Sequence, residues 1–519
     1  MLFHAEPIEF TPQPGCGAPV WKGRAADGED LMRFAVSVHR HEGRLAALWG
    51  EDRRLRNEGF LLHCVFGLDE GHAWVTLDLP AEHPVYPDLS GIFPAANRMQ
   101  RATQDLVGIA HDGKDQRPWL RHGAWPPGWH PLRHDAGEGR EFDNVPSDYG
   151  FVQVGGEGAH EVPVGPIHAG IIEPGHFRFS VIGERVLRLE QRLGYLHKGV
   201  EKRFVGMDLA AGARLAGRVS GDATCAYAWA YAAAVEAACG VAPPPRALML
   251  RALMLERERV ANHLGDLGAL GNDAALAFGF SQFMRLKEDW LRLNGRLFGH
   301  RFMMDRIAPG GVVLDLEAPA LSAIVEQCGT IGREVKELRK IYDEHAGLQD
   351  RFLTTGAIDA DLARELSLTG MAARATGLIL DGRAHRQDYT PPPPWTTLGV
   401  RPATDERGDV AARAAVRFDE IFESLRLLRE IAVGMPDSEL RAEVPPRPGG
   451  SGLGVIEGWR GEVLVGVELD GDGRLARVHP HDPSWQIWPA LEHAVMRDIV
   501  PDFPLINKSF NLSYSGQDL

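Results

Sequence analysis

The stretch Gly165-Pro166-Ile167-His168-Ala169-Gly170-Ile171-Ile172-Glu173-Pro174-Gly175-His176-Phe177-Arg178 stands where the pattern of the chain changes. Residues 167–189 contain β-rich pieces around Gly175 and Gly183, which predict a hairpin. Residues 463–475 predict a second hairpin, turned by Asp470-Gly471-Asp472-Gly473. Between the hairpins, apolar residues recur at helical spacing in six segments: 223–238, 246–264, 280–298, 321–345, 361–366 and 410–434. We therefore expect residues 161–519 to form a large, mainly helical domain with small sheet elements.

The residues before this domain mix helical and strand patterns. Residues 31–49 carry apolar side chains at helical spacing, and residues 93–105 predict a helix that Gly108 ends. The short runs 63–68 and 73–79 are typical of β-strands. Residues 1–133 are thus predicted to form a small α+β domain, which makes the fold class of the whole chain α+β. Residues 134–160, rich in Gly, Asp, Glu and His, predict a linker that would let residues 1–133 be expressed as a separate domain.

Composition sets the broad class of the protein. The chain has 519 residues, of which 44% are hydrophobic and 24% charged, as in soluble globular proteins. It contains no run of 18 uncharged apolar residues, and its first ten residues do not resemble a signal peptide. A net charge of -15 argues against a nucleic-acid surface. We therefore expect no membrane span and no nucleic-acid partner.

Five cysteines, at positions 16, 64, 225, 239 and 328, are too widely spaced for CxxC zinc sites or local iron–sulfur motifs. We expect reduced thiols that are buried as small hydrophobic side chains. Cys225 lies five residues after Ser220, which places its side chain on another face of a helix. We therefore expect Cys225 to belong to the core.

Two segments resemble the cysteine motifs of the [NiFe] hydrogenase large subunit. Arg218-Val219-Ser220-Gly221-Asp222-Ala223 is similar to its R-[IV]-C-G-x-C box, and residues 502–516 are similar to its D-P-C-x-x-C box. The four cysteine positions hold Ser220, Ala223, Ser513 and Gly516 here. A nickel–iron centre needs soft thiolate ligands, and these four residues offer none. The resemblance therefore implies a degenerate metal site, and we expect this chain to bind no metal.

The wider resemblance covers most of the chain. Residues 100–109, 115–118 and 129–133 resemble the small peripheral-arm subunit of respiratory complex I. The remainder resembles the large subunit of energy-converting [NiFe] hydrogenases of the hydrogenase-3 and hydrogenase-4 type (group 4), which is homologous to the quinone-site subunit of complex I. Its anchors are residues 165–178, 194–202, 256–266, 297–301 and 309–312. Fusion of the two subunits in one chain is itself a feature of these hydrogenases. The resemblance implies that residues 1–133 and 161–519 are these two domains.

The resemblance also assigns candidate catalytic residues. It implies that Glu173 relays protons, the alternative being a turn glutamate that faces solvent. His168 and His176 flank this glutamate, and we expect a structural hydrogen bond from each. The histidine with which complex I contacts quinone corresponds to Pro174, and the corresponding tyrosine falls at about Gly221. Tyr227 would replace that tyrosine only on a rotated helix.

Further residues are expected at an interface or in the former metal pocket. The run Glu256-Arg257-Glu258-Arg259 is predicted to pack at an interface, in a region that in relatives lies near the partner subunit carrying the proximal [4Fe-4S] cluster. His300 and Arg301 would tune this cluster or pack between helices. The polar side chains of the old pocket are Ser220, Asp222, Ser513 and Ser515. They would bind a hard cation, line a substrate pocket or form a collapsed, hydrogen-bonded vestige.

Two functions remain open from the sequence. In the first, the chain is an oxidoreductase subunit of an assembly similar to NADH-quinone oxidoreductase and hydrogenase-4. It then passes electrons from a partner's iron–sulfur cluster to an acceptor, for which quinone is favoured, with proton coupling. In the second it is a non-catalytic scaffold of such an assembly. Both predict an iron–sulfur small subunit and membrane-arm subunits as partners, and a peripheral position on the cytoplasmic side of the cell membrane. The missing thiolates argue against an active [NiFe] hydrogenase.

Overall fold

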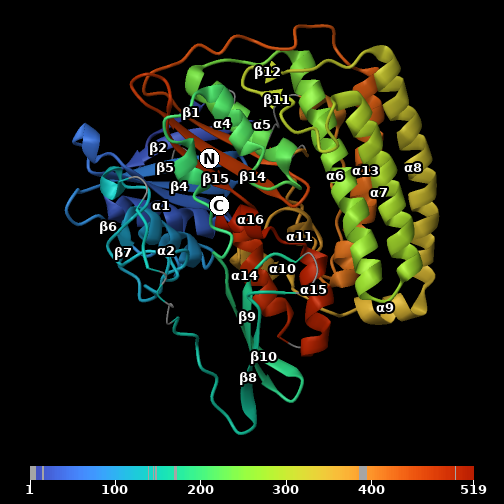
Figure 1. Ribbon diagram of the computed structural model, residues 1–519, viewed down its shortest axis with the longest axis horizontal. Coiled ribbons are helices and arrows are strands. Elements are labelled where there is room, and N and C mark those ends of the chain that lie inside the picture. The colour runs from blue at the N-terminus through green and yellow to red at the C-terminus, as the bar shows by residue number, and fades with distance from the viewer. Residues whose placement is uncertain are drawn as a thin grey trace.

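The computed structural model describes residues 8–13, 17–137, 140–143, 145, 149–168, 172–384, 394–496 and 498–519. Cys16, and Ala169, Gly170 and Ile171 of the stretch quoted above, lie outside this range. The mixed α+β architecture agrees with the fold class predicted from the sequence (Figure 1).

The N-terminal part is built on a five-stranded sheet of order β1-β2-β5-β4-β3. Its strands are β1 (Phe10–Gln13), β2 (Val20–Ala25), β3 (Arg44–Asp52), β4 (Phe60–Leu68) and β5 (Gly71–Leu79). The helices of this part are α1 (Gly28–Arg40), α2 (Ala96–Val107) and two short 3₁₀-helices, η2 (Arg54–Arg56) and η3 (His134–Ala136). A small parallel pair joins β6 (Val85–Tyr86) to β7 (Ala110–His111). The two predicted strands and the helix ended by Gly108 are confirmed.

The helix predicted over residues 31–49 is wrong in its second half. Helix α1 ends at Arg40, and strand β3 begins at Arg44. The turn between them places Glu42 at a φ of 57°. Residues 45–49 are buried without interruption. A short run that is buried throughout fits a helix or a central strand equally well by its spacing, which explains the error.

The C-terminal part begins with three antiparallel strands that project from the body at the bottom of Figure 1: β8 (Ala159–Val164), β9 (His176–Ile182) and β10 (Arg185–Arg192). The predicted hairpin is confirmed as β9 and β10, turned at Gly183. A second sheet of order β13-β14-β15 contains β13 (Ser451–Glu457), β14 (Glu462–Leu469) and β15 (Leu475–His481), and it packs against helix α5 (Thr224–Cys239). The predicted hairpin over residues 463–475 is therefore part of a three-stranded sheet.

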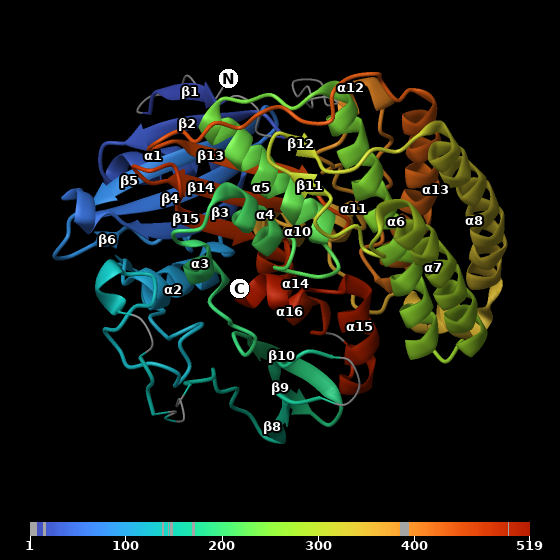
Figure 2. The ribbon, with the colours of Figure 1, turned by 45° about the horizontal axis from the view of Figure 1, so that its top comes forward.

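Four long helices lie side by side at one end of the molecule, as both ribbon views show (Figures 1 and 2). They are α6 (Pro245–Asp273), α7 (Ala277–Phe298), α8 (Ala318–Glu344) and α13 (Val410–Val433). The shorter elements are α3 (Val200–Phe204), α4 (Leu209–Ala216), β11 (Ile307–Ala308), β12 (Gly311–Val312), α9 (Ala346–Phe352), α10 (Ala360–Glu365), α11 (Gly370–Arg374), α12 (Trp395–Leu398), α14 (Ser484–Ala494), η4 (Val500–Asp502), α15 (Phe503–Phe510) and α16 (Tyr514–Asp518). Each of the six helical segments predicted for residues 161–519 has its counterpart among these elements and α5.

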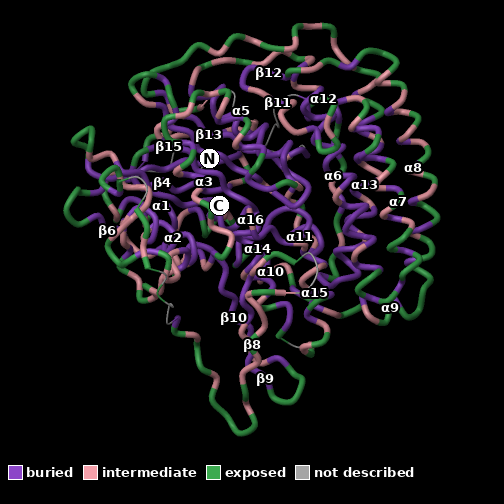
Figure 3. Tube along the Cα trace, in the orientation of Figure 1, coloured by how far each residue is buried: buried purple, intermediate pink, exposed green. Residues whose placement is uncertain are grey.

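The two parts share a hydrophobic core rather than touching at their surfaces. One cluster of buried side chains joins residues of the N-terminal sheet to residues of α14 and α15, and another joins β3 to β13 and β14. The Trp49 ring lies 4.7 Å from the ring centroids of both His63 and His479. The buried colouring runs through the region where the two parts meet (Figure 3). The boundary at residue 133 stays a prediction.

The predicted linker is anchored at Tyr149. This side chain is 8% exposed, its hydroxyl accepts a 2.8 Å hydrogen bond from Arg101, and the Arg192 guanidinium lies 3.9 Å from its ring centroid. Residues 138–139, 144 and 146–148 of the linker lie outside the described range. The linker thus contacts both the N-terminal helix α2 and the projecting strand β10.

Within the described residues, no helix combines the length and the hydrophobicity needed to cross a membrane. Cys225 is 2% exposed and belongs to the main hydrophobic cluster, which confirms the prediction that it is a core residue.

Candidate functional site

The first half of the site is the turn before helix α5. Ser220 and Asp222 lie on this turn, and the helix begins at Thr224. The Glu258 carboxylate, from α6, accepts from the backbone N–H of Cys225 at 2.7 Å and from that of Ala226 at 3.2 Å. These are N–H groups that have no partner inside the helix. Burial raises the pKa of Glu258 to about 8. A glutamate that the sequence predicts at an interface is therefore a buried cap that fixes this turn.

The second half of the site is the C-terminal segment between α15 and α16. Asn511 ends α15 with a φ of 46°. The Ser513 backbone N–H donates to Ser484 Oγ at 2.9 Å, and Ser513 Oγ accepts from the Gly516 N–H at 2.9 Å. Ser513 is thus the N-cap of α16.

The two halves meet through hydroxyl groups. Ser220 Oγ lies 3.0 Å from Ser513 Oγ and donates to Asp222 Oδ1 at 2.5 Å. Because Ser220 has one hydroxyl proton, Ser513 must be the donor in the contact between the two serines. Ser515 Oγ lies 3.4 Å from Ser513 Oγ. The segments that resemble the two cysteine motifs are therefore brought together, as the resemblance predicts.

Arg460 is the guanidinium that joins the two halves of this site. It follows β13, is 3% exposed, and donates to Asp222 Oδ2 at 2.6 Å and to the Asn511 carbonyl at 2.7 Å. Its NH1 atom is buried and has no hydrogen-bond partner among the described residues. Trp459 lies under the guanidinium at 4.2 Å and donates to the Asp222 carbonyl. Burial opposes ionisation of Asp222, but Arg460 outweighs it, and the pKa of Asp222 is lowered.

Asp482 occupies the space next to Gly516. A Cβ atom at position 516 would lie 2.4 Å from Asp482 Oδ2. Tyr227 donates to this same oxygen at 2.7 Å, and the Ser484 N–H donates to Asp482 Oδ1 at 2.8 Å. Tyr227 and Asp482 are both fully buried. Tyr227, which the sequence argument set aside, therefore does reach the site.

The four positions do not fit a nickel–iron centre. Ser220 and Ser513 supply hydroxyls that are bonded directly to each other, and Ala223 supplies a methyl group. Gly516 supplies no side chain, and the carboxylate of Asp482 fills the place where one would begin. Soft transition metals select thiolates, so this donor set lacks the ligands that such a centre requires.

Glu173 lies at the surface, in the segment before β9. Partial burial raises the pKa of its carboxyl, although Lys198 attracts the ionised form and the Ser515 backbone N–H donates to it. Glu173 therefore neighbours the C-terminal segment of the site. His168 Nε2 bonds to the Gly175 carbonyl at 2.8 Å, and His176 Nδ1 bonds to the Gly165 carbonyl at 3.1 Å. Both histidines thus make backbone hydrogen bonds within this segment, and their roles stay predictions.

His300 and Arg301 lie in the turn after α7. His300 Nδ1 accepts from the backbone N–H groups of Phe302 and Met304, and Arg301 forms a bidentate pair with Glu288 at 2.6 and 3.0 Å. The Phe302 carbonyl lies 3.8 Å from Cys225 Sγ, so this turn adjoins the start of α5. A role near a partner's cluster stays a prediction. By contrast, all four residues of the run 256–259 are buried inside the chain, which corrects the expectation of an interface there.

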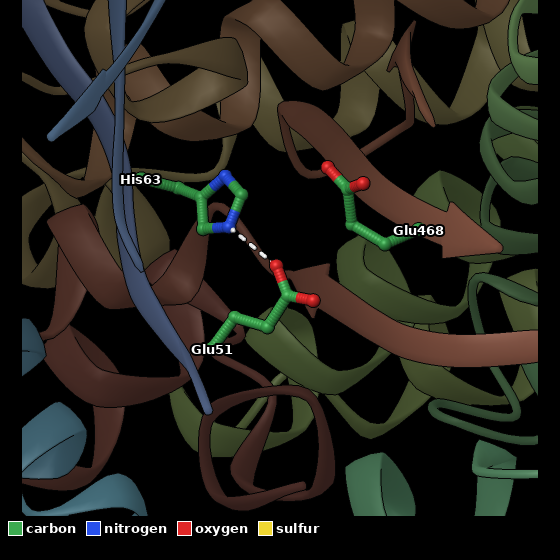
Figure 4. Close-up of side chains that lie close together, drawn as sticks. All are labelled: Glu51, His63 and Glu468. Carbon is green, nitrogen blue, oxygen red and sulfur yellow. Dashed lines mark ion pairs between the residues drawn. The ribbon is translucent and has the colours of Figure 1, made fainter. Parts of the chain in front are cut away.

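A second group of possible ligands lies between the two parts of the chain. One ligand atom from each of Glu51, His63 and Glu468 falls within 4.8 Å of the others (Figure 4). His63 Nε2 faces Glu51 Oε2 at 3.5 Å, while the Trp74 indole N–H donates to His63 Nδ1 at 3.1 Å. Because an indole nitrogen only donates, neutral His63 carries its proton on Nε2 and has no lone pair there for a metal.

Cations already neutralise these carboxylates. Arg53 Nε donates to Glu51 at 2.8 Å, and Lys22 Nζ lies 3.6 Å from Glu468 Oε1. Burial raises the pKa of Glu468 to about 7 and lowers that of His63 to about 4. We read this group as a buried ionic contact that joins β2, β3 and β4 to β14.

Comparison with known proteins agrees with both halves of the architecture. The model of the 30 kDa subunit of respiratory-chain NADH dehydrogenase matches residues 25–141, and that of the 49 kDa subunit matches residues 266–447. Formate hydrogenlyase subunit 5 of Escherichia coli is 30% identical over 496 residues, which cover 92% of this chain and 85% of that protein. The chain belongs to this family. It is a fused subunit of the complex I 30/49 kDa type, related to the large subunits of hydrogenase-4 and formate hydrogenlyase.

Two further relatives extend the comparison. Hydrogenase-4 component G of Escherichia coli is 30% identical over 501 residues, covering 94% of this chain and 86% of that protein. A chain in the structure of the membrane-bound sulfane sulfur reductase, an archaeal respiratory membrane complex, matches with a TM-score of 0.65. It is 24% identical and covers 70% of this chain and 99% of that one, and so supports the fold alone.

Sequence reasoning about this fused 30/49 kDa-type chain missed two residues of the site, Arg460 and Asp482, and set a third aside, Tyr227. Arg460 follows a predicted strand within Trp459-Arg460-Gly461, and Asp482 opens the tripeptide Asp482-Pro483-Ser484 before a helix. In both cases a charged residue lies just after a β-strand, and such a position indicates a side chain that the fold holds in place. Nothing local shows that Asp482 meets Tyr227, because 255 residues separate the two.

Proposed function

We propose that the chain is a subunit of a membrane-associated complex related to complex I and hydrogenase-4, and that it passes electrons from a partner's [4Fe-4S] cluster to an acceptor in the remodelled pocket. Family membership supports the assembly, since formate hydrogenlyase subunit 5 and hydrogenase-4 component G are themselves components of larger enzymes by name. The iron–sulfur small subunit and the membrane-arm subunits are the proposed partners. They would hold the chain on the cytoplasmic side of the membrane.

The observation that carries an acceptor site is the unpartnered NH1 of Arg460. A buried guanidinium N–H without a partner is costly, and a ligand oxygen that accepts from it would remove this cost. A quinone carbonyl is such an oxygen and is the acceptor we favour. Its reduction to the quinol takes two electrons from the partner cluster and two protons. Glu173, whose carboxyl has a raised pKa, is the proposed proton relay.

We further propose that this chain carries no nickel–iron centre and is not an active [NiFe] hydrogenase. The support is the donor set itself: two mutually bonded hydroxyls, a methyl group and a glycine at the four thiolate positions. Metal analysis of the purified protein by mass spectrometry should find no stoichiometric nickel. About one nickel atom per chain would contradict the proposal.

A non-catalytic scaffold is the alternative function, and one observation favours it. The direct hydroxyl contacts between Ser220 and Ser513 fit a collapsed pocket in which the ligand positions satisfy one another. Both functions predict that a tagged chain co-purifies with a cluster-bearing partner. Only the first predicts that the isolated complex, given chemically reduced viologen, reduces decylubiquinone. Recovery of the intact complex without this activity would favour the scaffold.

A further inference from the structure

A fully buried ionic network lies beside the site but takes no part in it. Helices α6, α11 and α13, strand β13 and the segment after α11 each contribute charged side chains that are at most 7% exposed. Arg374 is central: its Nε donates to Glu420 at 2.8 Å, its NH1 donates to Glu457 at 2.8 Å, and its NH2 lies 2.6 Å from Glu420 Oε1. The described members are Glu256, Arg259, His263, Arg374, Asp381, Arg383, Glu420 and Glu457.

The charges of this network do not balance. Among the described residues it contains four carboxylates and three guanidiniums, with His263 as the remaining titratable group. An uncompensated charge in such a dry place is strongly unfavourable, so one proton has to be bound for neutrality. Two groups can hold this proton: His263, which bonds to Glu420 at 2.6 Å, and Glu457.

Geometry favours Glu457. Its Oε1 accepts from Arg374, but its Oε2 has only a long 3.5 Å contact with the Gly382 N–H. The other charges that face it are Arg259 of α6 and Asp381, with Glu420 of α13 behind Arg374. Burial raises the pKa of Glu457 more than Arg374 lowers it, whereas burial lowers the pKa of His263.

Glu457 also has a route to solvent. Together with Asp381 and Gly382 it lines an open cavity of about 990 Å³, a volume that includes solvent-open space, between the N-terminal sheet and the C-terminal body. Residues from both parts line it, among them Arg44, His72 and Thr369. His72 Nδ1 and Thr369 Oγ1, from two of these lining residues, are buried without a hydrogen-bond partner in the described structure.

We propose that Glu457 is a proton-binding site: it takes a proton from water in this cavity and holds it as a neutral carboxylic acid in the ionic network. Glu457 lies at the end of β13, three residues before Arg460. The stored proton is therefore held next to the pocket whose reaction consumes protons. That use rests on the proposed function, but the proton-binding site does not.

The test compares the full-length chain with its Glu457→Gln variant, which copies the neutral acid in shape and in hydrogen bonding. Since the folded-state pKa lies above the unfolded value, the wild type loses stability as pH rises from the ordinary glutamate range toward the folded pKa. The glutamine variant lacks this loss. Its urea midpoint should equal or exceed that of the wild type at neutral pH, and the gap should widen as pH rises above the ordinary glutamate range.

A spectroscopic measurement identifies the group directly. At neutral pH the wild type should show an infrared C=O band of a buried protonated carboxyl that Glu457→Gln lacks, resolved in a difference spectrum from other buried acids such as Glu258, whose pKa burial also raises. The matched control is Glu443→Gln, at an exposed position outside the network, which should keep both the band and the wild-type pH profile.

Two outcomes would overturn the assignment. A clear loss of stability in Glu457→Gln at neutral pH would mean that Arg374 needs an ionised partner there. Persistence of the band would place the proton on another group, and loss of the pH dependence in His263→Gln instead would identify that group as His263. Neither readout involves an acceptor, so failure here is distinct from failure of the proposed function.

Discussion

The Tyr227 hydroxyl donates a 2.7 Å hydrogen bond to Asp482 Oδ2, and that oxygen lies where a side chain at position 516 would begin. A buried tyrosine and a buried aspartate therefore meet at the position where the resemblance to [NiFe] hydrogenases places the fourth cysteine ligand. The Asp482 carboxylate and the Ser513 hydroxyl occupy the space that a side chain at position 516 would need.

Substitution of Gly516 by cysteine should be destabilising. The new Cβ would meet Asp482 Oδ2 at 2.4 Å and Ser513 Oγ at 2.9 Å, and these atoms are held by hydrogen bonds to Tyr227 and Ser220. Overpacking of this kind costs about 1–3 kcal/mol, measurable as a lower urea midpoint. Gly221→Ala is the matched control, because nothing lies within 4 Å of its added Cβ. Equal midpoints for the two variants would show that Asp482 moves aside without cost.

Tyr227→Phe should also be destabilising, since it leaves a buried carboxylate oxygen with one donor fewer. The expected cost is about 1–3 kcal/mol, the range for an unsatisfied buried polar group. Tyr231→Phe, one turn further along α5, is the control: its hydroxyl donates to the neutral Leu209 carbonyl at 3.0 Å. Denaturation of both variants should show the larger loss at Tyr227, and the reverse order would contradict the prediction.

How far the sequence predicts this molecule depends on the range of the contacts involved. Hairpins with Gly183 or Asp470 at their turns, and long amphipathic helices, are local patterns, and the structure confirms them. The run 45–49 was misassigned because complete burial removes the periodicity that separates helix from strand.

The candidate site shows the same limit. The convergence of Ser220 and Ser513 was implied by the resemblance to two known motifs, although 293 residues separate them. Arg460 and Asp482 belong to no motif that the sequence argument used. Their roles arise only when β13, β15 and the C-terminal segment pack together. Burial of Glu258 likewise could not be read from its charge run, because a solvated helix face gives the same pattern.

The shared core leads to a prediction about the linker. A protease that cuts within residues 134–160 should nick the chain without releasing the N-terminal part, because Trp49 and Arg477 join the two parts. Arg477 donates to the Gly50 carbonyl at 3.0 Å, and the Trp49 ring stacks on His479. Size-exclusion chromatography of the nicked protein should therefore give one peak that contains both fragments. Separate peaks under native conditions would show that the N-terminal domain is held by the linker alone.

Replacement of Glu173 by glutamine tests the proton relay. The variant keeps the shape and hydrogen bonding of the side chain but removes its titration. In the assembled complex, turnover should fall by about tenfold to a thousandfold. This loss overlaps the lower part of the range that is typical of general acid–base groups. Because the pKa of Glu173 is raised, its carboxyl stays protonated to a higher pH than an ordinary glutamate. If it donates the proton, wild-type turnover falls as pH rises through that pKa, and the pH profile of the variant lacks this fall.

Glu184→Gln, in the exposed turn between β9 and β10, is the control and should keep the wild-type pH profile. Intact turnover and an unchanged pH profile in a fully assembled Glu173→Gln complex would remove Glu173 from the mechanism and favour the scaffold function.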